Sequence, residues 1–438
     1  MRRLRWALLA SVAVALVRCG PEPMDPRRQI GPHPYLPPLH QYLLPPMRLA
    51  DKGNWGNDRP TVPPGLKIAA LGKGFKNPRS LYVLPNGDIL VVETQGPNPP
   101  PVRRPKEFVM NWMEHQTHSS TPGGNRLILL RDTNGDGLPD LRTVFLKNLR
   151  SPFGVVLVGN DLYVANTDAV MRYPYRTGEI GITDPGTKVC DLPGGPIDHH
   201  WTKSLTASPD GKKLYAGVGS NSNITENGII AEVGRASIWE IDRATGAHRE
   251  FATGLRNPNG LQFEPQTHVL WAVINERDEL GPDLVPDYLT SVRDGAFYGW
   301  PYSYYGQHVD PRVQPQRPDL VAKAIPPDYA LSSHVAPLGM VFYTGNNLPA
   351  EYRGGAFIGE HGSWDRSVLN GYKVVYVPFE NGRPSGMARD VVTGFLKGDV
   401  ARGRPVGLAI DKTGALLIAD DVGNAVWRVT AAGSEGIP

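Results

Sequence analysis

One complete repeat unit occupies residues 78–92, Pro78-Arg79-Ser80-Leu81-Tyr82-Val83-Leu84-Pro85-Asn86-Gly87-Asp88-Ile89-Leu90-Val91-Val92. Its first half is a proline followed by a small residue two positions later and an apolar residue three positions later. Its second half is a tight turn followed by an alternating strand, and Asn-Gly is the strongest short hairpin signal. The unit therefore predicts a pair of short antiparallel strands.

Degenerate copies of both halves recur along the chain. The turn and strand return at residues 159–164, 209–215, 269–272, 354–359 and 413–418. The first half returns as Pro152/Gly154/Val155, Thr202/Ser204/Leu205, Pro258/Gly260/Leu261, Pro337/Gly339/Met340 and Pro405/Gly407/Leu408, and the Thr202 copy lacks the proline. Six units spaced by roughly 50–90 residues predict an all-β, six-bladed β-propeller with four-stranded antiparallel blades.

A propeller has a geometric consequence for the residues beside the six copies. The first strand of each blade lines the central channel, so the residues just before these strands gather at one mouth of the channel. Polar side chains far apart in sequence are therefore expected to converge there.

Composition agrees with many short strands and excludes several classes of protein. Of 438 residues, 40% are hydrophobic, and 49 Gly with 43 Pro imply frequent turns. Setting aside Arg2, Arg3, Arg5 and Arg18 leaves 42 Lys and Arg against 43 Asp and Glu. A nearly neutral protein is not expected to bind nucleic acid.

The N-terminal region divides into two segments before the repeats begin. Residues 1–20 have a basic start and an apolar run of about 12 residues, typical of a secretion signal and short for a membrane span. Lipid anchoring through Cys19 is disfavoured because Arg18 precedes it. Residues 21–65 are proline-rich and are expected to wrap onto a propeller domain at 66–438. We therefore expect a periplasmic or secreted protein, with Cys190 as a buried inert thiol.

From about residue 66 to 430 the chain resembles the soluble PQQ-dependent sugar dehydrogenases, the glucose/sorbosone dehydrogenase family, and is nearer its sorbosone-dehydrogenase-like branch. The resemblance is carried by five stretches in order, at residues 254–261, 275–281, 295–301, 335–337 and 402–406. It implies an oxidoreductase that uses calcium-bound pyrroloquinoline quinone (PQQ), a small sugar or alcohol substrate and an external electron acceptor.

The resemblance also assigns roles to residues of this chain. It implies that His200 is the base that removes the hydroxyl proton, a task suited to a neutral imidazole. Arg256 and Asn257 would lie over the quinone carbonyls, where a guanidinium stabilises arriving negative charge, and Asn259 stands where relatives have Gln. Without the resemblance, a structural ion pair explains Arg256 about equally well, and Asp198, His199 and His200 would form a hydrogen-bonded cluster in the channel without catalysis.

The same family pattern suggests where the carboxylates of PQQ are bound. Arg402 and Arg404 resemble its Arg-x-Arg pair, and forked guanidinium groups match carboxylates. Residues i and i+2 of an extended segment point the same way, so both arginines could reach one ligand. Two solvated surface arginines remain the alternative.

Two candidate calcium sites follow, one from the resemblance and one from a motif. The calcium ion that activates PQQ would be held around the main-chain carbonyls of Asp278 and Glu279, whose carboxylates could also bind it. Separately, Asp132, Asn134, Asp136 and Asp140 occupy positions 1, 3, 5 and 9 of a calcium-loop pattern that lacks the final Glu. A plain turn between strands explains that loop almost as well.

Two other classes of function remain open. A calcium-dependent propeller lactonase or other hydrolase would use carboxylates and bound water, and would not need Arg256, Arg402 and Arg404. A non-enzymatic binding propeller would not need His200 beside Arg256.

Overall fold

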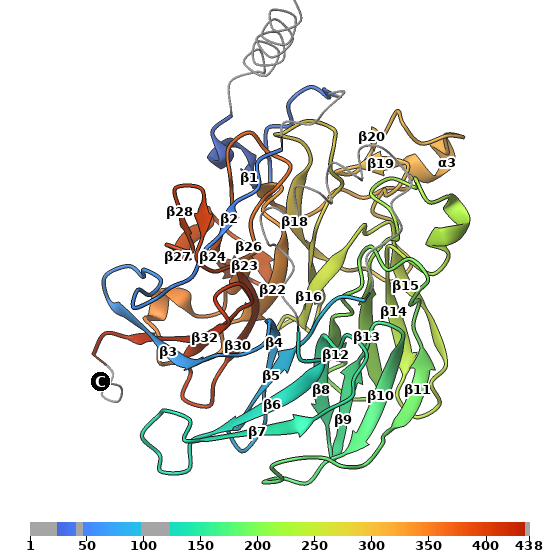
Figure 1. Ribbon diagram of the computed structural model, residues 1–438. Coiled ribbons are helices and arrows are strands. Elements are labelled where there is room, and N and C mark those ends of the chain that lie inside the picture. Colours follow the sequence, from blue (N-terminus) through green and yellow to red (C-terminus); the bar gives the residue numbers. More distant parts are fainter. Residues whose placement is uncertain (1–23, 41–46, 98–122, 434–438) are drawn as a thin grey trace, which may run out of the picture.

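The computed structural model describes residues 24–40, 47–97 and 123–433 (Figure 1). These residues form an almost entirely β structure, and their helical segments are single turns. The short helices are η1 (Pro26–Gln29), η2 (Ile229–Glu232), α3 (Pro318–Val321) and η3 (Ala350–Tyr352). The predicted all-β class with four-stranded antiparallel sheets is confirmed.

The larger sheets each contain four strands, which follow chain order except where the last sheet takes one from the N-terminal part of the chain, and another sheet gains a fifth strand from that part. Four of these sheets, written from one edge to the other, are β4 (Pro78–Val83), β5 (Ile89–Glu93), β6 (Arg126–Arg131) and β7 (Leu141–Leu146); β8 (Gly154–Val158), β9 (Asp161–Ala165), β10 (Ala169–Pro174) and β11 (Thr187–Asp191); β12 (Leu205–Ala207), β13 (Lys213–Val218), β14 (Ser237–Asp242) and β15 (His248–Thr253); and β22 (Pro337–Phe342), β23 (Ala356–Glu360), β24 (Lys373–Val377) and β27 (Arg389–Val392).

Two more sheets include strands from the N-terminal part of the chain. One is β16 (Pro258–Phe263), β17 (Leu270–Ile274), β18 (Pro286–Ser291), β21 (Tyr329–Ser333) and β1 (Ile30–Gly31). The other is β30 (Pro405–Ile410), β31 (Leu416–Asp420), β32 (Ala425–Ala431) and β3 (Leu66–Lys73). Smaller ladders are formed by β2 (Asp51–Lys52), β28 (Leu396–Lys397) and β29 (Val400–Ala401); β19 (Ser303–Tyr304) and β20 (His308–Val309); and β25 (Phe379–Glu380) and β26 (Arg383–Pro384).

The six strands that carry the first half of the repeat lie at the centre of the molecule (Figure 1). Going round the centre, β4 is next to β8, β8 to β12, β12 to β16, β16 to β22, β22 to β30, and β30 to β4. Each is an edge strand of its own sheet. The sheets therefore radiate from a ring of inner strands, which is a propeller-like arrangement.

The small residue of the repeat is explained by how closely the inner strands approach one another. A Cβ atom at Gly339 would lie 2.1 Å from the carbonyl oxygen of Val406, and one at Gly407 would lie 2.7 Å from the Cα of Ser80. The hydroxyl of Ser204, at the equivalent place, accepts a hydrogen bond of 3.2 Å from the Gly260 N–H. The third repeat position is thus small because the neighbouring backbone occupies the space of a side chain.

All six copies also line a single narrow cavity of about 130 Å³. It is bordered by Ser80–Tyr82, Phe153–Val156, Ser204–Thr206, Gly260–Gln262, Leu338–Met340 and Gly407–Leu408. The predicted convergence of widely separated repeat positions is therefore observed at the centre of the fold.

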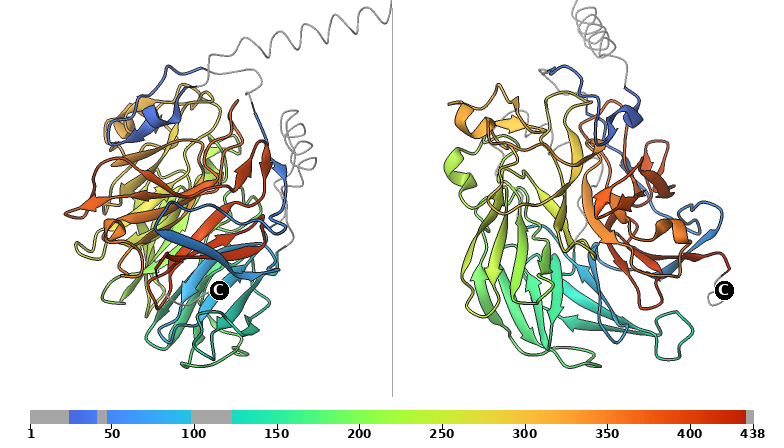
Figure 2. Two further views of the ribbon diagram at one scale, coloured as in Figure 1. Left: turned by 90° about the vertical axis from the view of Figure 1, so that its left-hand side faces the viewer. Right: turned by 180° about the vertical axis from the view of Figure 1, so that it is seen from behind.

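The described part of the proline-rich segment runs along the outside of the domain (Figures 1 and 2). β1 extends the sheet of β21, and β2 pairs in parallel with β29. Trp55 is buried, and its indole N–H donates a 2.7 Å hydrogen bond to the Asp420 carboxylate. The strand that follows, β3, pairs with β32 near the end of the chain, so the two ends of the domain complete one sheet.

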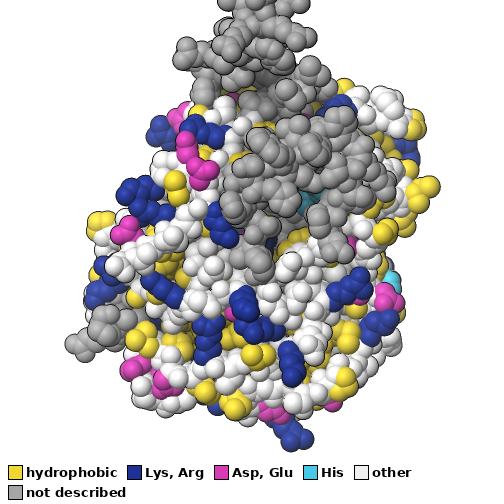
Figure 3. All heavy atoms as spheres, in the orientation of Figure 1, with side chains coloured by type: hydrophobic (Ala, Val, Ile, Leu, Met, Phe, Trp, Pro, Cys, Tyr) yellow, Lys and Arg dark blue, Asp and Glu magenta, His cyan; other side chains and the backbone are white. Residues whose placement is uncertain are grey.

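Basic and acidic side chains are interspersed over the visible face in Figure 3, apart from the area covered by atoms that are not described. Within the described residues, no helix is long and apolar enough to cross a membrane. The predicted signal segment, residues 1–20 with Cys19, lies outside the described residues.

Candidate active site

His200 lies at the mouth of the ring, shortly before β12, and is half-buried. Its Nδ1 is 2.9 Å from the carbonyl oxygen of Ser220 and 3.0 Å from the Ser220 hydroxyl, and its backbone N–H also donates to that carbonyl. Because a carbonyl oxygen can only accept, Nδ1 carries the hydrogen and Nε2 keeps the lone pair of the neutral ring. The predicted base is therefore held in the tautomer that a base requires.

The surroundings of His200 favour its neutral form. Burial lowers its pKa well below the ordinary value, and the positive charge of Arg256 and the neighbouring His199 act in the same direction. The two histidine rings lie edge to face, with their centres 4.5 Å apart. A ring that stays neutral at pH 7 can accept a proton from a bound hydroxyl group.

Arg256 is buried, and its guanidinium is fully engaged by the protein. Nε donates to the Asn223 carbonyl, Nη1 to the carbonyls of Asn275 and Glu276, and Nη2 to the Asn223 side chain and to Asp278, at distances of 2.6–3.4 Å. A guanidinium has five N–H groups, and each one has an acceptor here. Arg256 therefore supplies fixed positive charge near His200, and direct contact with a quinone would require one of these bonds to be exchanged.

Asn257 and Asn259 differ in whether their side-chain oxygen already accepts a hydrogen bond. The Oδ1 of Asn257 is buried and accepts no hydrogen bond in the described part of the chain. A Cβ atom at Gly219 would lie 2.5 Å from both this Oδ1 and the Cβ of His200, so the missing side chain brings these two residues together. Asn259 is completely buried and accepts a hydrogen bond from the Thr202 hydroxyl at 3.2 Å.

Arg402 and Arg404 contact different groups. Arg404 donates to the Tyr372 hydroxyl at 3.3 Å, lies 5.0 Å from the centre of that ring, and has a buried Nε without an acceptor among the described residues. Arg402 instead donates to the Asp58 carboxylate at 2.8 Å. Within this pair, Arg404 is the arginine with a buried donor that lacks an acceptor among the described residues.

A further arginine at the mouth, Arg79, was missed from the sequence. Arg79 and His361 both contact the buried carboxylate of Asp421, at 2.6 Å and 2.9 Å, and the Nε of Arg79 is buried without an acceptor in the described residues. The Arg79 guanidinium lies 5.7 Å from the centre of the Trp201 ring, next to His200 in sequence. Arg79 directly follows the proline of the first repeat copy, so the convergence rule could have identified it.

A cluster of metal-binding side chains is formed by Asp278, His334 and Asp365, whose ligand atoms lie within 4.8 Å of one another. Burial alone would lower the pKa of His334, but its hydrogen bond to Asp278 and the charge of Asp365 outweigh burial and raise it to about 9. Burial raises the pKa of Asp365 to about 6. The His334 imidazolium therefore balances one of the two carboxylate charges, and it pairs directly with Asp278.

The main-chain carbonyl of Asp278, a predicted calcium ligand, already accepts hydrogen bonds within the protein. The carbonyl oxygen of Asp278 accepts hydrogen bonds from the Asn223 amide, at 3.1 Å, and from the Arg277 guanidinium. The Glu279 backbone has a φ of 71° and donates its N–H to Asp365 at 2.8 Å. The side-chain carboxylates of Asp278 and Asp365 thus form the oxygen-rich part of this cluster, while the Glu279 carboxylate pairs with Arg312 at 3.1 Å. Hard oxygen donors fit Ca²⁺.

Comparison with known proteins identifies the family of this chain. The family model described as glucose / sorbosone dehydrogenase matches residues 164–370, and a TrAA12-like model matches residues 313–432. An uncharacterised protein of Borreliella burgdorferi is 31% identical over 294 residues, covering 65% of this chain and 76% of that protein. The chain belongs to the glucose/sorbosone dehydrogenase family.

The chain is also similar to two proteins whose names state an activity. The aldose sugar dehydrogenase of Escherichia coli is 29% identical over 177 residues, which cover 39% of this family member and 42% of the relative. The PQQ domain of the pyranose dehydrogenase from Coprinopsis cinerea, in its holo form, has a TM-score of 0.69 at 20% identity, covering 85% of this chain and 97% of that one.

The second predicted calcium site lies away from the mouth of this glucose/sorbosone dehydrogenase family protein. Asp132, Asn134, Asp136 and Asp140 are exposed, and their side chains accept hydrogen bonds from the loop's own backbone. Among the described residues, they do not form a close group of metal-binding atoms like that of Asp278. The loop has the geometry of a self-capped turn.

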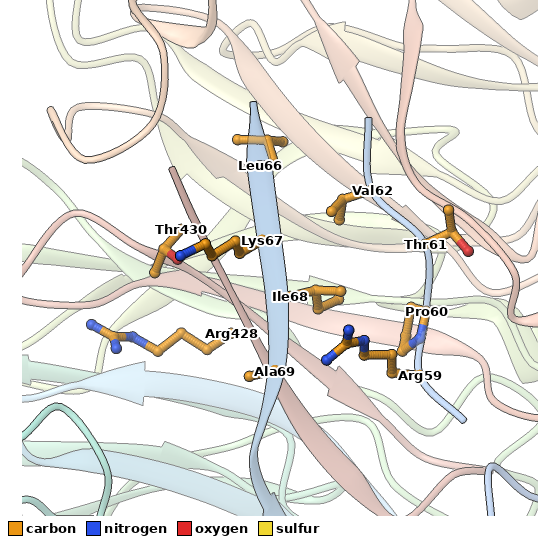
Figure 4. Close-up of a pocket in the computed structure, with 10 residues that line it drawn as sticks. All are labelled: Arg59, Pro60, Thr61, Val62, Leu66, Lys67, Ile68, Ala69, Arg428 and Thr430. Atoms are coloured by element: carbon orange, nitrogen blue, oxygen red, sulfur yellow. The ribbon is translucent and has the colours of Figure 1, made fainter. Parts of the chain in front are cut away.

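Two other features lie outside the site. A groove of about 540 Å³ runs between residues 59–62 and the edge strand β3, with Arg59, Lys67 and Arg428 among its lining residues (Figure 4). None of the predicted site residues lines it. Cys190 is buried as predicted, and burial raises the pKa of its thiol to about 11. That the thiol is inert stays a prediction.

Proposed function

We propose that this protein is a PQQ- and calcium-dependent oxidoreductase that oxidises a sugar, a sugar-derived aldehyde of the sorbosone type or a related alcohol. The observation that carries the proposal is His200, whose Nδ1–H is fixed on Ser220 while Nε2 is left to accept a proton. Its position beside the arginine-rich mouth supports an anionic cofactor near a base. Family membership gives independent support.

The donors at the mouth fit PQQ, which carries three carboxylates. Arg79 and Arg404 each have a buried Nε without an acceptor in the described residues, and forked guanidinium groups suit carboxylates. The buried Oδ1 of Asn257 is likewise free to accept a hydrogen bond from a ligand. We assign Arg79 and Arg404 to the carboxylates, with Arg402 able to join them if it leaves Asp58.

The proposed chemistry assigns a distinct task to each part of the site. PQQ, when bound, supplies the acceptor for the hydride. His200 accepts the hydroxyl proton at Nε2, and Ser220 keeps the ring in the required tautomer. Arg256 provides fixed positive charge, while Asp278, Asp365 and Glu279 would hold Ca²⁺ through their carboxylates.

We also propose that residues 66–438 form one closed six-bladed propeller, preceded by a signal at 1–20 and a wrapping segment at 21–65, and that the protein is periplasmic or secreted. The ring of β4, β8, β12, β16, β22 and β30 supports this blade count. An experimental structure in which another strand entered the ring would contradict it.

The test of the function is reconstitution. Apoprotein is mixed with PQQ and Ca²⁺, and reduction of an artificial dye acceptor is followed with a panel of aldoses, ketoaldehydes and polyols. We expect dye reduction that requires substrate, PQQ and Ca²⁺ together. Lactone hydrolysis by the metal-loaded protein, with no PQQ-dependent dye reduction, would overturn the proposal in favour of a hydrolase.

A further inference from the structure

Arg235 is a buried arginine that links two segments at the mouth of the ring. Its Nη2 donates to the Asp198 carboxylate at 3.2 Å and to the carbonyl oxygen of Ile197 at 3.4 Å. Its Nη1 donates to the carbonyl oxygen of Gly219 at 3.3 Å. One guanidinium therefore holds residues 197–198 and residue 219 at a fixed separation.

These two segments carry the two partners of the hydrogen bond that fixes the base. Asp198 lies two positions before His200, and Gly219 lies one position before Ser220, which accepts from the His200 ring and backbone. Any change in the distance between the segments changes that hydrogen bond directly. Displacement of a reacting group by about 1 Å can reduce a rate by up to a hundredfold.

Asp198 has a different role from that of an aspartate placed directly on a catalytic histidine. Its Oδ1 accepts from the Arg235 guanidinium and, at 2.7 Å, from the Gly195 N–H. In the described part of the chain it makes no hydrogen bond to His200. The carboxylate acts on the base only through the arginine and through the chain that leads to His200.

Glu232 holds the other end of the segment that contains Ser220. Glu232 accepts a 2.7 Å hydrogen bond from the Asn221 N–H, and its carbonyl oxygen accepts from the Arg235 N–H at 3.0 Å. The segment 219–221 is thus held at one end by the Arg235 side chain and at the other by Glu232. Ser220 lies between these two attachments.

We propose that Arg235, paired with Asp198, is a positioning residue for His200 that keeps Nδ1–H on Ser220 and Nε2 directed to the substrate. As far as turnover is concerned, this inference rests on the proposed function. The tautomer and orientation of His200 are properties of the protein alone and can be measured without any substrate.

The test compares Arg235→Lys with Arg428→Lys. Lysine keeps the positive charge beside Asp198, but a single ammonium lacks the fork that reaches both segments. Arg428, on β32, is a matched control because its side chain is buried to a similar degree and pairs with Asp411 at 2.6 Å. Both variants lose a buried guanidinium group, but only Arg235→Lys affects the contacts to residues 198 and 219.

The first readout is the ¹⁵N spectrum of the histidine rings near pH 7, with the His200 signal identified from its loss in His200→Gln. We expect one Nδ1–H tautomer in the unmodified chain and in Arg428→Lys, and a mixture in Arg235→Lys. The second readout is turnover at saturating PQQ, which should fall about ten- to a hundredfold in Arg235→Lys with little change in KM.

An unchanged tautomer together with turnover equal to that of Arg428→Lys would overturn the inference. If Arg235→Lys does not fold, Asp198→Asn replaces it, and unchanged tautomer and turnover in that variant would have the same meaning. If the unmodified chain showed no PQQ-dependent turnover, the proposed function would fail, while the tautomer comparison would still decide the role of Arg235.

Discussion

His200 presents one nitrogen to a substrate, because the other is committed to Ser220. The pKa of its ring is lowered by burial and by the charges that face it, from Arg256, His199 and Arg235. The free histidine side chain has a pKa of about 6.5. A lowered value means that the neutral, proton-accepting form persists on the acid side of that pH.

The pH dependence of kcat/KM should reflect this shift. Activity that depends on neutral His200 is retained as the pH falls through 6.5. It is lost only when the pH reaches the lowered pKa of His200 in the folded protein. The measurement is kcat/KM between pH 5 and 8, with PQQ saturation verified at each pH. An acid limb centred above pH 6.5 would show that the limiting base is another group.

The two arginines of the Arg-x-Arg pair should differ when mutated. Arg404 has a free buried donor, whereas Arg402 is occupied by Asp58. Loss of a charge-assisted bond costs about 1.5–3 kcal/mol, so Arg404→Ala should weaken PQQ binding about ten- to a hundredfold. Arg402→Ala should weaken it less. Titration of PQQ by fluorescence quenching measures both, and equal affinities in all three proteins would remove the pair from the cofactor site.

The sequence singled out His200, Asn257 and Arg404 as site residues, because the repeat predicts where polar residues converge and the family pattern names them; their roles stay predictions. It could not show that Arg256 has all of its donors satisfied, because its acceptors come from Asn223 and from residues 275–278. Contacts of this kind depend on how neighbouring sheets pack and have no local signature.

At the scale of the element, the third position of each repeat copy is where one inner strand meets the next. Gly339 shows this most clearly, because an added Cβ would lie 2.1 Å from a backbone oxygen of Val406. The turn between β4 and β5 behaves as predicted from Asn86-Gly87, with Gly87 at a φ of 97°. Both features could be predicted from sequence because each depends on a single short motif.

Gly339→Ala should therefore destabilise the protein. Forcing a methyl group into a filled space costs about 1–3 kcal/mol, and here the obstacle is backbone. Gly181→Ala is the control, since its Cβ would meet its nearest neighbour at 3.5 Å, and it should change the free energy of unfolding by about 0.5 kcal/mol or less. Urea unfolding of both variants measures the difference. Equal stabilities would contradict the close approach of β22 and β30.

PQQ binding should require calcium held by the segment that contains Asp278 and Glu279. Asp278 and Asp365 would hold Ca²⁺, and the ion would supply positive charge for an anionic cofactor, so treatment with EDTA should weaken PQQ binding at least about tenfold. Asp278→Asn should have the same effect, and Asp132→Asn, in the exposed loop, should have none. PQQ titration with and without Ca²⁺ tests this. Equally tight binding after EDTA treatment would show that this segment does not hold the ion.

At the scale of the whole molecule, six inner strands form a ring, and the last sheet is completed by β3 from the N-terminal side. The ring explains how residues as distant as Arg79, His200 and Arg404 belong to one mouth. The sequence predicted this convergence, because it follows from the repeat. It did not predict the parallel pairing of β2 with β29, which depends on where the proline-rich segment meets the finished domain.

The central claim, that His200 acts as a base on a substrate beside bound PQQ, is tested most directly by turnover of His200→Ala at saturating PQQ. A positioned general base contributes about 10²–10⁴-fold, so turnover should fall by that factor while PQQ affinity stays within about twofold of the unmodified protein. Normal turnover at saturation in the folded variant would contradict the account.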